Sequence, residues 1–152
     1  MILISHRGNI KGIPDFENNP EKIDHVISMG YNVEVDVRIY NDELYLGHDK
    51  PEYKTSINWI LQRSSKLWIH CKDLKSLELI SGHSSSNNLN YFFHNTDKCT
   101  ITSKGYLWVY PGFQPVKNSI AVMPEINKED TGDCIGICSD NIDYYSKLLN
   151  NE

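Results

Sequence analysis

Alanine is almost absent from this 152-residue sequence, with a single copy at Ala121, whereas asparagine occurs fifteen times. Because alanine is the best helix former and asparagine favours turns, the sequence predicts few helices and many loops. Long apolar runs are absent too, and no stretch approaches the ~20 residues that a membrane-spanning helix needs. We therefore expect a protein without a membrane span.

Basic residues are in the minority, with 15 Lys and Arg against 20 Asp and Glu and a formal net charge of −5. This balance argues against a nucleic-acid partner, which requires clustered Lys and Arg. The N-terminus has no signal-peptide pattern, and the cysteine spacing is not typical of a zinc finger. We expect a cytoplasmic protein with reduced thiols, the alternative being a disulfide or metal pair at two of its four cysteines, Cys134 and Cys138.

Strand patterns alternate with helical patterns along the chain. Residues 32–40 alternate apolar and polar side chains, which is typical of a strand, and Asn41-Asp42 predicts a turn into a returning strand at 43–49. Asn19-Pro20 predicts the start of a helix that Gly30 ends. The other expected strands are 2–5, 67–73, 90–95, 100–102, 106–111, 119–125 and 134–140, and the other expected helices are 57–61, 75–80 and 142–149.

This order favours a parallel sheet with helical connections. A complete barrel of eight strands and eight helices usually needs ~200 residues or more. We therefore expect a reduced TIM-type (β/α) barrel that is largely parallel, has short or missing outer helices, and forms one domain over residues 1–152.

Ionisable residues follow nearly every expected strand, and two of them stand out. Glu34 and Asp36 are two positions apart in one strand, so their side chains point to the same face. This face could be the solvent face of a half-exposed strand. In a barrel it would point inward, and two inward carboxylates require a cation, for which Mg²⁺ or Ca²⁺ is the simplest candidate.

Four short segments occur in a specific order: HRG at 6–8, EN at 17–18, EVDVR at 34–38 and GHD at 47–49. In this order and spacing they resemble the glycerophosphodiester phosphodiesterase family, a member of the phospholipase C-like barrel superfamily. The later segments IHCK at 69–72 and GICSD at 136–140 are similar to further segments of that family. The resemblance implies a short member of the family, a hydrolase of lipid metabolism.

The resemblance also implies roles for individual residues. It implies general acid–base chemistry for His6 and His48, and a divalent cation, Mg²⁺ or Ca²⁺, held by Glu34 and Asp36. His70 stands where the family has an acidic third ligand, so we expect it to bind the cation and to move the preference towards Mn²⁺ or Zn²⁺. The expected phosphate contacts are Arg7, Lys72 and Arg38, and the expected lining of the pocket is Glu17, Asn18, His94 and Glu125. Glu125 or Asp73 could supply the missing carboxylate instead.

These residues predict the metal-dependent hydrolysis of a small-molecule phosphodiester. A cation and an arginine would offset the charge of the phosphate, and two histidines would transfer the protons. One alternative is transfer to a hydroxyl of the substrate, which gives a cyclic phosphate. The other is a catalytically inactive barrel that binds a phosphodiester, which the substitution at His70 would suit.

Overall fold

The computed structural model describes residues 1–150, and the last two positions of the expected domain, 151 and 152, lie outside the described residues. These residues form ten strands, four α-helices and two short 3₁₀ helices. In chain order they are β1 (Ile2–His6), α1 (Pro20–Ser28), β2 (Asn32–Tyr40), β3 (Glu43–Leu46), β4 (Tyr53–Lys54), α2 (Ile57–Gln62), β5 (Leu67–Cys71), α3 (Leu74–Gly82), η1 (Ser86–Asn88), β6 (Asn90–Phe93), β7 (Cys99–Ile101), β8 (Leu107–Val109), β9 (Ser119–Val122), η2 (Pro124–Ile126), β10 (Gly136–Ser139) and α4 (Ile142–Asn150). None of the helices in 1–150 is long and apolar enough to cross a membrane.

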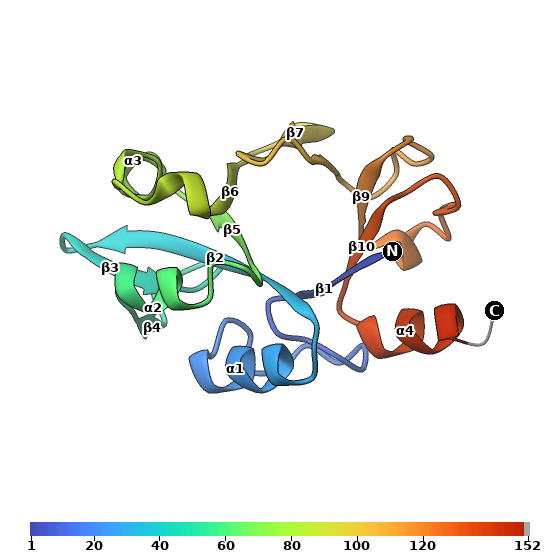
Figure 1. Ribbon diagram of the computed structural model, residues 1–152, viewed down its shortest axis with the longest axis horizontal. Helices are drawn as coiled ribbons and strands as arrows, with labels where there is room; N and C mark the ends of the chain where they lie inside the picture. Colours follow the sequence, from blue (N-terminus) through green and yellow to red (C-terminus); the bar gives the residue numbers. More distant parts are fainter. Residues whose placement is uncertain (151–152) are drawn as a thin grey trace.

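All ten strands belong to one mixed sheet, which curls into an open half-barrel (Figure 1). The order along the sheet is β4-β3-β2-β1-β10-β9-β8-β7, and β5 pairs with the other edge of β2 and carries β6. Six strand pairings are parallel and three are antiparallel. The expected reduced TIM-type barrel is therefore wrong, because the sheet is mixed and does not close.

Tight hairpins produce most of this difference. Asn41 and Asp42 both have positive φ, 50° and 60°, which suits the type I′ turn that returns β3 antiparallel to β2. A second hairpin joins β7 to β8, where the Gly105 N–H donates to the Thr102 carbonyl at 2.8 Å. The sequence predicted the turn at Asn41-Asp42, but no strand ladder joins β6 to β7 within the described part of the chain, so the half-barrel stays open.

The helices cover the outer face of the sheet. α1 begins as the sequence predicted, since the Asn19 side chain accepts hydrogen bonds from the N–H groups of Glu21 and Lys22 at 2.9 and 3.1 Å. Gly30, with φ of 97°, follows its end. Between the helices and the strands lies an outer core whose buried members include Ile23 and Val26 of α1 together with Val33, Val35, Val37, Ile60, Leu67, Ile69 and Ile80.

The inner face of the half-barrel has an apolar floor and a polar rim. The buried floor consists of Ile4, Trp68, Phe92, Trp108, Ile120, Val122 and Cys138. Side chains on one face of a strand recur every second residue. A residue two positions after a floor residue therefore lies on the same face, one step closer to the end of the strand. Together with two residues of β2, these positions form what we call the polar ring: His6, Glu34, Asp36, His70, His94, Tyr110 and Asp140. The ring lies at the carboxyl ends of the parallel strands.

Gly136 of β10 provides a test of this packing. A Cβ atom at Gly136 would lie 2.6 Å from Cδ1 of Ile120 and 2.9 Å from both Cβ and the carbonyl oxygen of Ile2. Gly136→Ala should therefore force β10 away from its neighbours and lower the free energy of unfolding by about 1–3 kcal/mol in urea denaturation. The control is Gly82→Ala, where no atom lies within 4 Å of the added Cβ. Equal losses in the two variants would contradict this account of the packing.

Candidate metal centre

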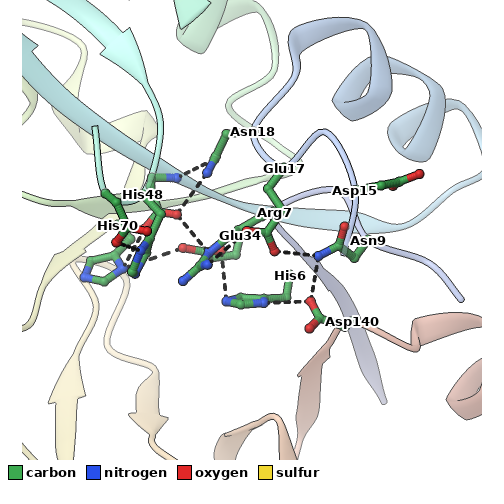
Figure 2. Close-up of polar contacts among 12 residues, drawn as sticks. His6, Arg7, Asn9, Asp15, Glu17, Asn18, Glu34, His48, His70 and Asp140 are labelled. Atoms are coloured by element: carbon green, nitrogen blue, oxygen red, sulfur yellow. Dashed lines mark hydrogen bonds and ion pairs between the residues drawn. The ribbon is translucent and has the colours of Figure 1, made fainter. Parts of the chain in front are cut away.

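Glu34, Asp36 and His70 meet inside the half-barrel. Asp36 of β2 and His70 of β5 are direct partners in the parallel register of these neighbouring strands. His70 Nδ1 lies 3.2 Å from Asp36 Oδ1 and 3.7 Å from Glu34 Oε1. Glu34 is 2% exposed and Asp36 is fully buried, so the inward orientation of the carboxylates is confirmed and the solvent-face alternative is wrong. Figure 2 shows Glu34 and His70 of this cluster together with His6 and Arg7.

The three residues are poorly satisfied by the rest of the protein. Glu34 Oε2, Asp36 Oδ1 and His70 Nε2 are buried and have no partner in hydrogen-bonding geometry within the described residues. Such groups are rare because each costs desolvation energy without a compensating bond. One ligand atom from each residue lies within 4.8 Å of the others, a geometry that could hold a metal ion. The chemistry of the donor set, two carboxylates and an imidazole, fits a divalent cation.

The surrounding charges stabilise Asp36 as a carboxylate. Burial acts to raise its pKa, but the adjacent His70, the Arg7 charge and a hydrogen bond from Asn18 outweigh burial and hold this pKa below the ordinary value. Arg7 Nε lies 3.0 Å from Asp36 Oδ2, and Lys72 Nζ lies 3.7 Å from Asp36 Oδ1. The pKa of His70 is raised, because its two acidic neighbours outweigh its burial.

The loop at 9–19 brings two of the predicted pocket residues to this cluster. Asn18 is buried with φ of 61°, and its amide binds Asp36 twice: Nδ2 donates to Oδ2 at 3.0 Å and Oδ1 accepts from the backbone N–H at 2.8 Å. Glu17 accepts a hydrogen bond from Arg7 Nη1 at 3.2 Å. Glu17 and Asn18 therefore fix the guanidinium and the carboxylate relative to each other.

His6 belongs to an adjoining network that contains two residues which sequence reasoning missed. Its Nδ1 lies 2.8 Å from Asp140 Oδ1, and its Nε2 lies 4.0 Å from Glu34 Oε2. Asn9 is fully buried, and its Nδ2 donates at 2.8 Å to both Glu17 Oε1 and Asp140 Oδ1. Nothing in the asparagine-rich loop singles out Asn9, whereas Asp140 ends a segment for which the sequence offered a resemblance but no role.

His6, Glu17 and Asp140 are also close enough to hold a metal ion. In this second cluster, however, oxygens of both carboxylates already accept N–H groups of Asn9, and Glu17 also accepts one from Arg7. The buried atoms without a hydrogen-bond partner among the described residues instead belong to the cluster of Glu34, Asp36 and His70, which is therefore the better candidate metal centre.

The pKa of His6 is raised. Burial acts to lower it, but the hydrogen bond with Asp140 and the charge of Glu34 outweigh burial. The same hydrogen bond lowers the pKa of Asp140. This carboxylate–imidazole pair fixes the ring so that Nδ1 faces Asp140 and Nε2 faces the metal cluster.

His48 lies in the loop between β3 and β4. The Gly47 N–H donates to the Asp36 carbonyl at 3.1 Å. This hydrogen bond ties the residue before His48 to β2. Gly47 has φ of 145°, and an added Cβ would lie 2.1 Å from the Lys50 carbonyl oxygen, so this turn requires glycine. His48 Nδ1 lies 2.7 Å from Asp49 Oδ1.

Two other predicted site residues are engaged elsewhere. Arg38 was expected at the phosphate, but its guanidinium donates to the carbonyls of Gly47 and His48 and so holds the hairpin. Glu125 accepts hydrogen bonds from Ser139 Oγ at 2.6 Å and Tyr145 Oη at 3.1 Å, which ties η2 to β10 and α4. In these contacts neither Arg38 nor Glu125 binds a side chain of the metal cluster.

No protein-family model matches the sequence, and a search of curated proteins finds no match either. The family resemblance therefore stays a prediction, and function has to be argued from the site itself.

The contact between His6 and Asp140 predicts a particular tautomer. When His6 is neutral, its proton should sit on Nδ1, because that atom faces a carboxylate oxygen. Nitrogen-15 NMR of the imidazole should detect this tautomer in the wild-type protein and a shift towards Nε2–H in Asp140→Ala. Asp143→Ala, which removes an acid that pairs with Lys147 on α4, is the control and should leave the His6 signals unchanged. A neutral wild-type ring that carries its proton on Nε2 would refute the assignment.

Proposed function

We propose that this protein is a divalent-metal-dependent phosphodiesterase that hydrolyses a glycerophosphodiester or a related small phosphodiester. The observation that carries the proposal is the buried cluster of Glu34, Asp36 and His70 directly beside His6, in which one ligand atom from each residue lies within 4.8 Å of the others and three polar atoms lack a hydrogen-bond partner among residues 1–150. A buried cation site next to a fixed imidazole and two cationic side chains suits chemistry on an anionic ester. The resemblance to glycerophosphodiester phosphodiesterases supports the same reaction.

The ligands would be one carboxylate oxygen from each of Glu34 and Asp36 together with an imidazole nitrogen of His70. Imidazole is a poorer ligand than carboxylate for Mg²⁺ or Ca²⁺ and suits Mn²⁺ or Zn²⁺ better. The site also carries one negative charge fewer than a site with three carboxylates. We therefore infer a preference for Mn²⁺ or Zn²⁺.

When bound, the cation would supply positive charge next to the phosphate. Arg7 and Lys72 add two more positive charges, one on each oxygen of Asp36. Arg7 is held between Asp36 and Glu17, so its guanidinium is oriented before a substrate arrives. Such preorganised charges stabilise a transition state without reorganisation during the reaction.

His6 and His48 would carry the protons. Hydrolysis forms a bond from the water oxygen to phosphorus, breaks the bond from phosphorus to the leaving oxygen, and moves one proton from the water to the leaving alkoxide. One histidine accepts the first proton and the other supplies the second. Each ring is held through Nδ1 by an aspartate, His6 by Asp140 and His48 by Asp49, which leaves Nε2 for proton transfer in both.

Turnover of bis(p-nitrophenyl) phosphate tests the proposal. The wild-type protein should release p-nitrophenol, EDTA should abolish the release, and Mn²⁺ should restore it. Asp36→Asn should lower kcat/KM by about 10²-fold or more, because it removes a ligand charge at the centre of the site. Asp143→Asn is the matched control and should retain activity.

Two outcomes separate the alternatives. If the wild-type protein binds the metal and the phosphodiester without turnover, it is a binding protein and the proposed function is wrong. If a glycerophosphodiester gives a cyclic phosphate as product, the reaction is transfer to a hydroxyl of the substrate and not hydrolysis.

His70→Asp tests the identity of the third ligand. A third carboxylate should tighten the binding of Mg²⁺ and Ca²⁺ by about tenfold relative to Mn²⁺, because hard cations prefer oxygen ligands. Titration calorimetry with each metal measures this ratio. His25→Asp on the exposed side of α1 adds the same charge away from the site and should leave the ratio unchanged. If His70→Ala also leaves all three affinities unchanged, the third ligand is another residue.

A further inference from the structure

The polar ring has a charged part and an uncharged part. The charged part comprises His6, Glu34, Asp36, His70 and Asp140, with Arg7 and Lys72 beside it. The uncharged part consists of His94 and Tyr110. Neither the metal cluster nor the proposed proton transfers involve His94 or Tyr110.

His94 and Tyr110 stack on each other at the opening of the half-barrel. His94 follows β6 directly and Tyr110 follows β8 directly, and these two strands are not neighbours in the sheet. The two rings are 3.4 Å apart between centroids and inclined by 18°. The Tyr110 N–H donates to the Lys98 carbonyl at 3.1 Å, which fixes the loop after β6 to the end of β8. The stack therefore has a defined position.

The stack lies next to the candidate metal centre. The centroids of the His94 and His70 rings are 6.1 Å apart. Cys71 and Phe93 are partners in the register of β5 and β6, so the residues that follow them, Lys72 and His94, come side by side. The stack is therefore within reach of a small ligand whose phosphate binds at the metal centre and Lys72.

Both members of the stack carry an unused polar atom. His94 Nδ1 and Tyr110 Oη are buried and have no hydrogen-bond partner among the described residues. A role confined to closing the sheet would be filled equally well by two apolar rings, which avoid the cost of unpaired polar atoms. The two atoms thus indicate a ligand that supplies the missing hydrogen bonds.

We propose that His94 and Tyr110 form a hydroxyl-binding subsite, which selects phosphodiesters whose alcohol portion carries a free hydroxyl group. This inference rests on the proposed function for its placement of the phosphate. A neutral imidazole and a phenol can each donate or accept a hydrogen bond, and an alcohol hydroxyl can do both. A purely alkyl ester would leave both atoms unpaired, so the subsite discriminates against it.

The test compares two phosphate monoesters that bind without turnover, sn-glycerol 3-phosphate and n-propyl phosphate, which share a three-carbon chain and differ in the free hydroxyls of the alcohol. Calorimetry in the presence of Mn²⁺ should show that the wild-type protein prefers glycerol 3-phosphate. Tyr110→Phe keeps the ring stack and removes only Oη, and it should reduce the preference by about tenfold, the effect of one hydrogen bond. Tyr106→Phe is the matched control, since the Tyr106 ring packs on Trp68 instead, and it should keep the wild-type preference.

The outcomes distinguish this subsite from the proposed function. Equal weakening of both ligands in Tyr110→Phe, no change in either, or a wild-type protein without any preference would each overturn the subsite. Turnover of bis(p-nitrophenyl) phosphate, which has no free hydroxyl, reports on the phosphodiesterase activity separately. A protein that hydrolyses this ester but shows no preference between the monoesters has the activity without the subsite. A protein that prefers glycerol 3-phosphate but does not hydrolyse the ester has the subsite without the activity.

Discussion

Two carboxylates buried on one face of β2 are the constraint on which the rest of the site depends. Glu34 and Asp36 cannot both stay ionised in the interior without positive partners. Arg7 supplies part of the positive charge that offsets the two carboxylates, and Asn18 forms two hydrogen bonds with Asp36. Both residues have positive φ, 52° for Arg7 and 61° for Asn18, a conformation that costs non-glycine residues about 1 kcal/mol or more. These two strained positions, one directly after β1 and one at the end of the loop at 9–19, bring both side chains to Asp36.

The alternation of side chains along the strands explains why the site lies where it does. Ile4 precedes His6 by two residues, Trp68 precedes His70, and both apolar residues lie in the buried floor. One register of parallel strands therefore produces a dry floor and a polar ring above it. The floor excludes water from below, which strengthens each electrostatic interaction in the ring. The same alternation places His94 and Tyr110 in the ring beside His70.

Local features of the fold could be predicted from the sequence, whereas the closure of the sheet could not. The helix start at Asn19-Pro20 and the turn at Asn41-Asp42 depend on neighbouring residues alone, and both are confirmed. β6 and β7 are separated by residues 94–98 alone, and whether they pair depends on how the whole sheet curls and on the hairpins that reverse the chain. Strand alternation predicts helices between parallel strands, but it does not tell which strand returns antiparallel.

The same division applies to the site. Strand alternation predicted that Glu34 and Asp36 share a face, and the resemblance added His70, which stands beside Asp36 on the neighbouring strand. Asn9 acts through bonds to Glu17 and Asp140, and the latter is 131 positions away in the chain. No pattern in the neighbouring sequence predicts such a contact. For Arg38 the resemblance implied a phosphate contact, and the structure adds a contact that no local signal predicts, because its guanidinium donates to the carbonyls of Gly47 and His48.

The position of the metal is the central claim, and anomalous diffraction from crystals grown with Mn²⁺ tests it most directly. The account predicts one strong anomalous peak among Glu34, Asp36 and His70, within coordination distance of a carboxylate oxygen from each acid and of an imidazole nitrogen. A peak at His6, Glu17 and Asp140, or no peak in the half-barrel at saturating Mn²⁺, would contradict it.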